Sequence, residues 1–185
     1  ELNSTISSFV ELVYSIEKKG LFVIKTSRGH INYIEREVNN YMNIDYPLLP
    51  KFYGKSEKSD KIIIQFINGD SLEDIKSLKL SIKDKITIIF EIMLTIQYLH
   101  SKKLVYIDLK PNNVIIDQAH TAFLIDFDRT INLEKKQDDQ YSKDLNVTFV
   151  APEFMKNYII SEKNDIYSIG KMIYFIINEE YPKNE

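Results

Sequence analysis

The stretch that decides the fold is Asp108-Leu109-Lys110-Pro111-Asn112-Asn113, followed thirteen residues after Asn113 by Asp126-Phe127-Asp128. An aspartate two residues before a lysine can orient a hydroxyl group, while the lysine neutralises negative charge that develops nearby. The amide oxygen of Asn113 and the carboxylate of Asp126 are oxygen ligands of the kind that magnesium prefers. This ordered set of groups suits the transfer of a phosphoryl group.

The bulk composition excludes several other classes of protein. A chain of 185 residues suits one domain, or two small lobes that share a core. It has no cysteine, which rules out disulfides and thiolate zinc sites and permits a reducing compartment. With 24 basic and 27 acidic residues the net charge is −3, so there is no electrostatic case for binding nucleic acid or an anionic membrane. The apolar run 166–177 is interrupted and too short to span a membrane.

Residues 1–67 are predicted to form a small β-rich lobe. Residues 8–26 are rich in β-formers around the turn-like stretch 17–20, which predicts an antiparallel hairpin. Strands are also expected near 51–54 and 61–67. Between them, apolar residues recur at helical spacing until two prolines end the pattern: Ile31, Ile34, Val38 and Tyr41, then Pro47 and Pro50.

Residues 68–185 are predicted to form a helical lobe, which begins after the break at Asn68-Gly69-Asp70 with Ser71 as an N-cap. Ser81 and Asp84 form a capping box ahead of a long helix that should pack against the catalytic loop. The periodic pattern of this helix is expected to run through Ile86, Ile89, Phe90, Met93, Ile96, Gln97 and Leu99.

Two short strands, 114–116 and 122–125, are expected to hold Asn113 and Asp126 at one end of a small ribbon. The polar stretch 129–148 is predicted to be a loop. The last helix is predicted over 162–178, with Ser161 or Asn164 as its cap. Its apolar residues surround the axis, which predicts burial on most sides.

Over nearly its whole length the sequence resembles the eukaryotic-like protein kinase family. Phe22-Val23-Ile24-Lys25 is similar to the strand that carries the family's phosphate-anchoring lysine, and Arg36-Glu37-Val38 to the helix whose glutamate pairs with it. Glu35 is the alternative partner of Lys25. The resemblance implies an α+β, two-lobed fold with a β-rich N-lobe and a truncated helical C-lobe.

The resemblance also implies a site for ATP and Mg²⁺. Asp108 and Lys110 would be catalytic, Asn113 and Asp126 would hold the metal, and Lys25 with Glu37 would position the phosphates. The stretch 62–69 is similar to the family's hinge, where the backbone of Gln65 and Ile67 would bind adenine, with Ile64 as gatekeeper. Ile115 would lie under the base, and Val10 would also contact the nucleotide.

Two later landmarks of the family are present, Ala151-Pro152-Glu153 and Asp165-Ile166-Tyr167-Ser168-Ile169-Gly170. Asp165 is expected to cap backbone amides of the catalytic loop. The three histidines are assigned no chemistry. His100 ends the long helix and is expected to be a capping or surface residue.

The sequence departs from the family at the phosphate-covering loop and before Asp108. When Phe9–Tyr14 is aligned with that loop, Thr5, Ser7 and Val10 stand where glycines are expected, which predicts weaker nucleotide binding. Tyr106-Ile107 replaces the usual His-Arg, so a phosphorylated loop would lack its counter-charge. We therefore expect no switching by loop phosphorylation.

Asp128 stands where the protein kinase family has glycine. In this respect the sequence resembles aminoglycoside and choline kinases, which often have an aspartate at that position. Asp128 is either a further metal ligand or a solvated turn residue. Lys110 and the Ala-Pro-Glu landmark favour the protein kinase branch. Because the chain begins at Glu1 rather than Met and ends soon after the last helix, the sequence is expected to be either truncated or a minimal kinase.

The predicted function is therefore an ATP- and magnesium-dependent serine/threonine protein kinase with a protein substrate or a regulatory protein partner. A pseudokinase that senses nucleotide or binds protein is the alternative, and a small-molecule phosphotransferase is a third possibility. The expected location is the cytoplasm, or a host cytosol if the protein is a delivered effector.

Overall fold

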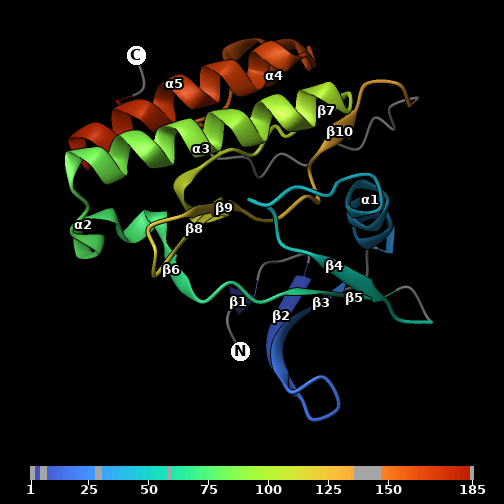
Figure 1. The fold of residues 1–185 in the computed structure, drawn as a ribbon. Coiled ribbons are helices and arrows are strands. Elements are labelled where there is room, and N and C mark those ends of the chain that lie inside the picture. The colour runs from blue at the N-terminus through green and yellow to red at the C-terminus, as the bar shows by residue number, and fades with distance from the viewer. Residues whose placement is uncertain (1–2, 5–7, 28–30, 58–59, 136–146, 184–185) are drawn as a thin grey trace.

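The computed structural model describes residues 3–4, 8–27, 31–57, 60–135 and 147–183. Its fold is α+β and two-lobed, with a β-sheet and one helix in the N-terminal region and paired long helices above short strands in the C-terminal region (Figure 1). This confirms the expected fold class. The predicted division after residue 67 remains a proposal, which is supported by the change from one sheet to the next between Gln65 and Gly69.

The N-terminal sheet has five antiparallel strands in the order β1-β2-β3-β5-β4. Their bounds are β1 Asn3–Ser4, β2 Ser8–Ser15, β3 Gly20–Ser27, β4 Phe52–Lys55 and β5 Lys61–Gln65. Strands β2 and β3 form the predicted hairpin, in which Ser15 pairs with Gly20 across the turn. Helix α1, Ile31–Tyr41, crosses this sheet and buries Ile34, Val38 and Tyr41, as their helical spacing predicts.

The C-terminal region contains the long helices and three short strand pairings. In chain order its elements are β6 Gly69–Ser71, the 3-10 turn η1 Leu72–Asp74, α2 Ile75–Leu78, α3 Ile82–Ser101, β7 Leu104–Val105, the 3-10 turn η2 Pro111–Asn113, β8 Val114–Asp117, β9 Ala122–Leu124, β10 Ile131–Asn132, α4 Pro152–Asn157 and α5 Glu162–Asn178.

Helix ends follow the predicted caps. The Ser71 hydroxyl accepts a hydrogen bond from Glu73 N at the start of η1. Ser81 and Asp84 form the expected capping box on α3, and Ser161 and Asn164 form another on α5. Strand β6 was not predicted. It requires Gly69, because a Cβ atom there would collide with the carbonyl of Ile116 on the paired strand β8.

The helix α3 is confirmed, but its predicted pattern is only partly right, because Ile96 and Leu99 are buried as expected whereas other positions are not. The side chains of Ile86, Phe90 and Met93 are exposed, with exposed fractions of 46%, 59% and 41%. Apolar residues lie on two faces of this helix. The face that packs toward α5 and β9 is not the one that carries Ile86, Phe90 and Met93. Its buried apolar residues are Ile88, Ile92, Ile96 and Leu99.

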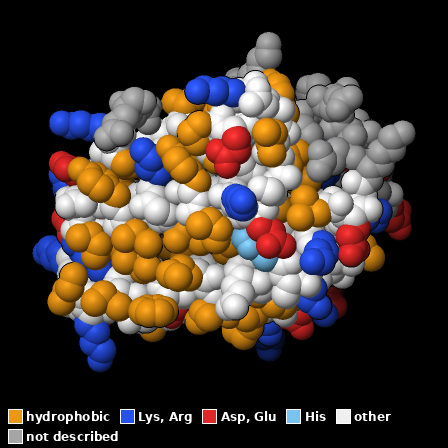
Figure 2. All heavy atoms as spheres, turned by 90° about the horizontal axis from the view of Figure 1, so that it is seen from above, with side chains coloured by type: hydrophobic (Ala, Val, Ile, Leu, Met, Phe, Trp, Pro, Cys, Tyr) orange, Lys and Arg blue, Asp and Glu red, His pale blue; other side chains and the backbone are white. Residues whose placement is uncertain are grey.

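The expected burial of α5 on most sides is also wrong. Ser168, Ile169 and Met172 are buried, but the opposite side of the helix is exposed. Figure 2 looks down on the layer of α3 and α5 and shows hydrophobic side chains gathered over it. The exposed apolar residues of α5 are Ile166, Ile173, Tyr174 and Ile177.

The predicted loop 129–148 is partly ordered as a strand, because β10 pairs with β7. Residues 136–146 lie outside the described residues. Among the described helices, none has the length and hydrophobicity that a membrane span requires.

Candidate active site

Three charged side chains from distant parts of the sequence meet between the sheet and α1. The Nζ atom of Lys25 on β3 lies 2.9 Å from Glu37 Oε2 on α1 and 2.7 Å from Asp126 Oδ1, which follows β9. Lys25 and Glu37 are buried, whereas Glu35 is exposed. Glu37 is therefore the glutamate that reaches Lys25.

Local structure explains why Glu37 points inward. It lies three residues after Ile34 and four before Tyr41, on the buried side of α1 that also includes the adjacent Val38. That face packs against the sheet that carries Lys25. A glutamate on an otherwise apolar, buried stripe is costly without a cationic partner, and Lys25 provides that partner.

The ion pairs set the charge states of this cluster. Burial opposes the charged form of Lys25, but the carboxylates of Asp126 and Glu37 outweigh it and raise the lysine pKa. Burial likewise opposes ionisation of Asp126, but the Lys25 ammonium outweighs it and lowers the pKa of Asp126. For Glu37, burial prevails and raises the pKa despite Lys25.

A second cluster surrounds Asp108. Its Oδ2 atom lies 2.8 Å from Lys110 Nζ, 3.1 Å from Asn113 Nδ2 and 3.8 Å from Arg129 Nε. Within the described residues, every donor to this carboxylate meets Oδ2. The geometry therefore leaves Oδ1 able to accept a hydrogen bond from a hydroxyl group.

Asn113 is held so that its amide nitrogen faces Asp108. Its Nδ2 atom also donates to the Asp108 carbonyl at 2.8 Å, which assigns the amide orientation and turns the oxygen away from Asp108. Ile125 N donates to Asn113 O at 2.9 Å, so Asn113 lies beside the residue that precedes Asp126.

The described residues contain no cluster of three or more His, Cys, Asp or Glu that could hold a metal by itself. The oxygen of Asn113 and the carboxylate of Asp126 nevertheless fit a hard cation. They would share that cation with phosphate oxygens of a bound nucleotide.

The turn before Asp108 is strained and is held by Asp165. Ile107 has φ of +70°, which is unfavourable for a β-branched residue, and Asp108 N donates to Tyr106 O at 2.9 Å across it. Fully buried Asp165 accepts hydrogen bonds from Tyr106 N and Ile107 N, both at 2.8 Å. The expected cap of the catalytic-loop amides is therefore present.

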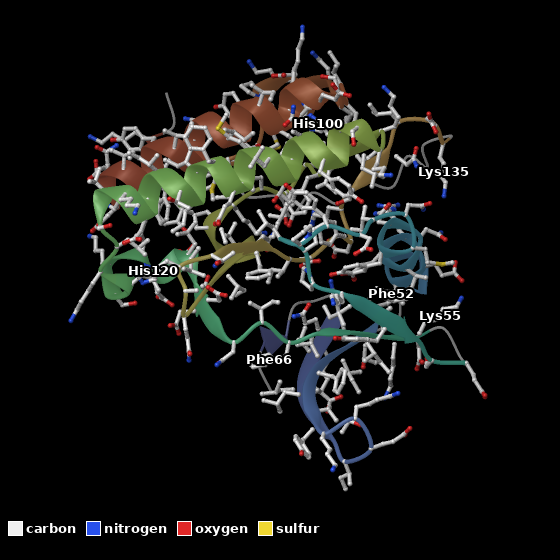
Figure 3. All side chains as sticks on the ribbon, in the orientation of Figure 1. Phe52, Lys55, Phe66, His100, His120 and Lys135 are labelled. Atoms are coloured by element: carbon white, nitrogen blue, oxygen red, sulfur yellow. The ribbon has the colours of Figure 1, made fainter. Side chains whose placement is uncertain are left out.

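The interpretation of His100 as a capping or surface residue is wrong. Its Nε2 atom lies 2.8 Å from Asp165 Oδ2, and its side chain is 13% exposed. Figure 3 shows His100 near the end of α3, beside α5. Position at a helix end could not reveal this contact, because Asp165 is distant in sequence.

Four aromatic rings form a column that joins the two clusters to the sheet. Tyr106 contacts Phe127 at a centroid distance of 5.5 Å, Phe127 contacts Tyr41 at 5.1 Å, and Tyr41 stacks on Phe52 at 5.6 Å. Figure 3 labels Phe52 at the β4 end of this column. The sequence analysis did not find it, because its members lie on four separate segments.

Comparison with known proteins agrees with this geometry. The profile of the protein kinase domain matches residues 7–185. The chain belongs to the protein kinase family. Similar proteins include spermatocyte protein spe-8 of Caenorhabditis elegans, with 30% identity over 78% of this chain and 29% of that protein.

Two further relatives have kinase names. The dual specificity protein kinase zak2 of Dictyostelium discoideum is 28% identical over 70% of this chain and 21% of its own length. The serine/threonine-protein kinase PrkC of Bacillus subtilis is 24% identical over 82% of this chain and 24% of its own length. The chain therefore spans less than a third of the length of these relatives.

Membership of the kinase family implies, in general, the use of ATP and Mg²⁺ and the phosphorylation of proteins. The residues predicted to contact the nucleotide lie as follows. Val10 pairs with Lys25 across β2 and β3, so both occupy one face of the sheet. Gln65 N donates to Lys51 O at 2.8 Å, so this N–H is already used within the protein. Ile115 is half-buried on β8.

Ile67 lies in the segment between β5 and β6. Phe9–Tyr14, which align with the phosphate-covering loop, lie in strand β2, and the alignment stays a prediction. Thr5 and Ser7, the other two positions aligned with glycines, lie outside the described residues. The nucleotide contacts of Val10, Gln65, Ile67 and Ile115 remain predictions.

Asp128 is partly buried rather than a solvated turn residue. Burial raises the pKa of Asp128 to about 7, and the nearby carboxylate of Asp126 contributes to this shift. The structure thus disfavours one of the two interpretations of this residue. Its role as a metal ligand stays a prediction.

Proposed function

We propose that this protein kinase transfers the γ-phosphoryl group of ATP to serine or threonine hydroxyls of proteins and uses Mg²⁺. The observation that carries the proposal is the convergence of two groups of side chains. Lys25, Glu37 and Asp126 form one ion cluster, and Asp108 with Lys110 forms the other. Their order along the chain matches the parts that phosphoryl transfer requires.

In the proposed reaction, Asp108 Oδ1 accepts the hydrogen bond of the acceptor hydroxyl and orients its oxygen toward the γ-phosphorus. A bond forms between that oxygen and phosphorus, the bond from phosphorus to the β,γ-bridging oxygen breaks, and ADP leaves. The hydroxyl proton passes to Asp108. Lys110, 2.8 Å from Asp108 Oδ2, stabilises negative charge on the transferred group.

Lys25 would bind nucleotide phosphates while Glu37 holds its ammonium group in place. Asn113 and Asp126 would hold Mg²⁺. A bound Mg²⁺ supplies neutralisation of phosphate charge and fixes the orientation of the phosphates. Loss of any one of these contacts should reduce transfer far more than it reduces stability.

The serine/threonine preference is the finer part of the proposal. The names of two relatives support it, since PrkC is a serine/threonine-protein kinase and zak2 a dual specificity kinase. The proposed location is the cytoplasm, where ATP and Mg²⁺ are abundant, or a host cytosol if the protein is a delivered effector.

The test is incubation with γ-labelled ATP, MgCl₂ and casein, followed by mass spectrometry of the phosphorylated residues. We expect label on serine and threonine. Lys25→Met should abolish transfer, while Lys61→Met, which changes an exposed lysine on β5, should leave it unchanged. Label on tyrosine alone would overturn the preference, and equal activity of Lys25→Met would overturn the proposed site.

A nucleotide-binding module without transferase activity is the second candidate. It is favoured by the absence of glycine before Gly20, because side chains in a phosphate-covering loop keep backbone amides away from phosphates. Thermal unfolding with ATP, measured with and without Mg²⁺, separates the candidates when read beside the transfer assay. A stabilising shift without transfer favours the binding module.

A further inference from the structure

Side chains of α1 form hydrogen bonds with the segment that follows Asp126. Asn40, which is 5% exposed, donates from Nδ2 to Phe127 O and to Thr130 O, both at 3.0 Å. One turn earlier on the same face of α1, Glu37 Oε1 accepts a hydrogen bond from Phe127 N at 3.3 Å. The helix therefore binds both the N–H and the C=O of Phe127. We call residues 127–132 the post-Asp126 segment.

The chemistry of the contact requires an amide at position 40. Both partners of Asn40 Nδ2 are backbone carbonyl oxygens, so only a donor group satisfies them. A carboxylate at the same place would face two oxygens at hydrogen-bonding distance. A buried polar side chain is costly unless it is hydrogen-bonded, which makes an incidental asparagine here unfavourable.

Apolar contacts also hold the segment, beside the ion pair of Arg129 with Asp108. Ile131 pairs with Val105 where β10 meets β7. Ile131 also belongs to a buried apolar cluster with Val105, Ile107, Val150 and Phe154. Ile107, which stands where the family has arginine before the catalytic aspartate, is thus a packing residue of this cluster.

We propose that Asn40 is a positioning residue that fixes the post-Asp126 segment, so that Asp126 stays beside Lys25 without a phosphate group on the chain. The expected effect on catalysis rests on the proposed function. The effect of Asn40 on the position of the segment can be measured even if the protein has no transferase activity. In this account, hydrogen bonds from α1 and packing of the Ile107 cluster hold the segment without a phosphate, in addition to the ion pair of Arg129 with Asp108.

The consequence concerns regulation of this site. The contacts of Asn40 and Ile131 exist in the unmodified chain, and neither uses an ionised group of the segment. The site should therefore be assembled in protein that carries no phosphate. Weakening the Asn40 contacts should free the segment and let Asp126 move from Lys25, which lowers affinity for Mg·ATP.

The test compares Asn40→Asp with Asn39→Asp in protein purified with phosphatase and shown by mass spectrometry to carry no phosphate. Asn39 is the adjacent residue on α1 and is exposed, so it provides the same chemical change outside the contact. Asn40→Leu, which removes the donors without adding charge, is a second variant. Each is measured by hydrogen exchange over 127–132 and by the KM for Mg·ATP.

In the unmodified, phosphate-free protein we expect slow exchange over 127–132. Asn40→Asp and Asn40→Leu should speed this exchange at least about tenfold and raise the KM for Mg·ATP by about the same factor, while exchange in the core of α3 stays unchanged. Asn39→Asp should change neither. A residue with a merely structural role would lower the melting temperature without this local change in exchange or KM.

The inference is overturned if both Asn40 variants exchange over 127–132 within twofold of the unmodified protein. It is also overturned if the phosphate-free protein exchanges rapidly there and slows only after phosphorylation. If exchange responds as expected but no variant, including the unmodified protein, transfers phosphate, the proposed function fails while the positioning role of Asn40 stands.

Discussion

Replacement of Asp165 by asparagine should strongly destabilise the fold through the strained turn at Ile107. Asp165 uses both carboxylate oxygens, since Oδ1 accepts from Ile107 N and Oδ2 from Tyr106 N, and Oδ2 also lies near His100 Nε2. An asparagine has only one acceptor oxygen, so its NH₂ group must face a backbone N–H in either orientation.

The expected magnitude follows from these contacts. A hydrogen bond to a charged acceptor contributes about 1.5–3 kcal/mol, and the remaining bond also loses its charged acceptor. Because the site is fully buried, water cannot replace the lost partner. We therefore expect Asp165→Asn to lower the free energy of unfolding by about 3 kcal/mol.

Asp117→Asn is the matched control. Asp117 also accepts two backbone N–H groups, from Ala119 and Thr121, but both bind the same Oδ1 atom, which an asparagine retains. Its expected loss is below about 1 kcal/mol. Urea unfolding followed by far-ultraviolet circular dichroism measures both variants, since the chain has no tryptophan. Equal losses, or a loss below about 1 kcal/mol for Asp165→Asn, would refute this reasoning.

Three further predictions concern the charge cluster and the core. Glu37→Gln should lower kcat/KM for ATP at least about tenfold, while Glu35→Gln leaves it unchanged; steady-state kinetics decide, and equal effects would contradict the assignment. In metal-free protein, Asp128 keeps its proton up to about pH 7 when folded but loses it near pH 4 when unfolded, so stability falls as pH rises between these values. Asp128→Asn should thus stabilise more at pH 8 than at pH 5 in urea titrations, and an equal gain at both would count against this. Ile88→Ala should lower the free energy of unfolding by about 2–4 kcal/mol, and Ile86→Ala by less than about 1 kcal/mol. A larger loss for Ile86→Ala would show that the face of α3 with Ile86 is the buried one.

The sequence was sufficient for features that depend on local patterns. The hairpin around 17–20, the capping box at Ser81 and the strands beside Asn113 all follow from neighbouring residues, and the structure contains each of them. The buried face of α3 did not follow, because the helix offers two apolar stripes. Only the packing of α5 and β9 distinguishes Ile88 from Ile86.

Features that depend on distant partners could not be predicted. Asn40 meets partners 87 and 90 residues away, and nothing in its neighbourhood along the chain marks it as buried or hydrogen-bonded. His100 likewise contacts Asp165 65 residues away. The glutamate that meets Lys25 was chosen by resemblance, and the structure adds the physical reason, which is that Glu37 shares the inward face of α1 with Val38.

The central claim is that the Asp108 carboxylate orients a protein hydroxyl for attack on ATP. Its most direct test is the single-turnover rate of phosphate transfer from ATP to a protein substrate by the unmodified protein and by Asp108→Asn, at saturating ATP and Mg²⁺. The account predicts that the variant still binds ATP but transfers phosphate at least about a hundredfold more slowly. Equal transfer rates for the two proteins would contradict it.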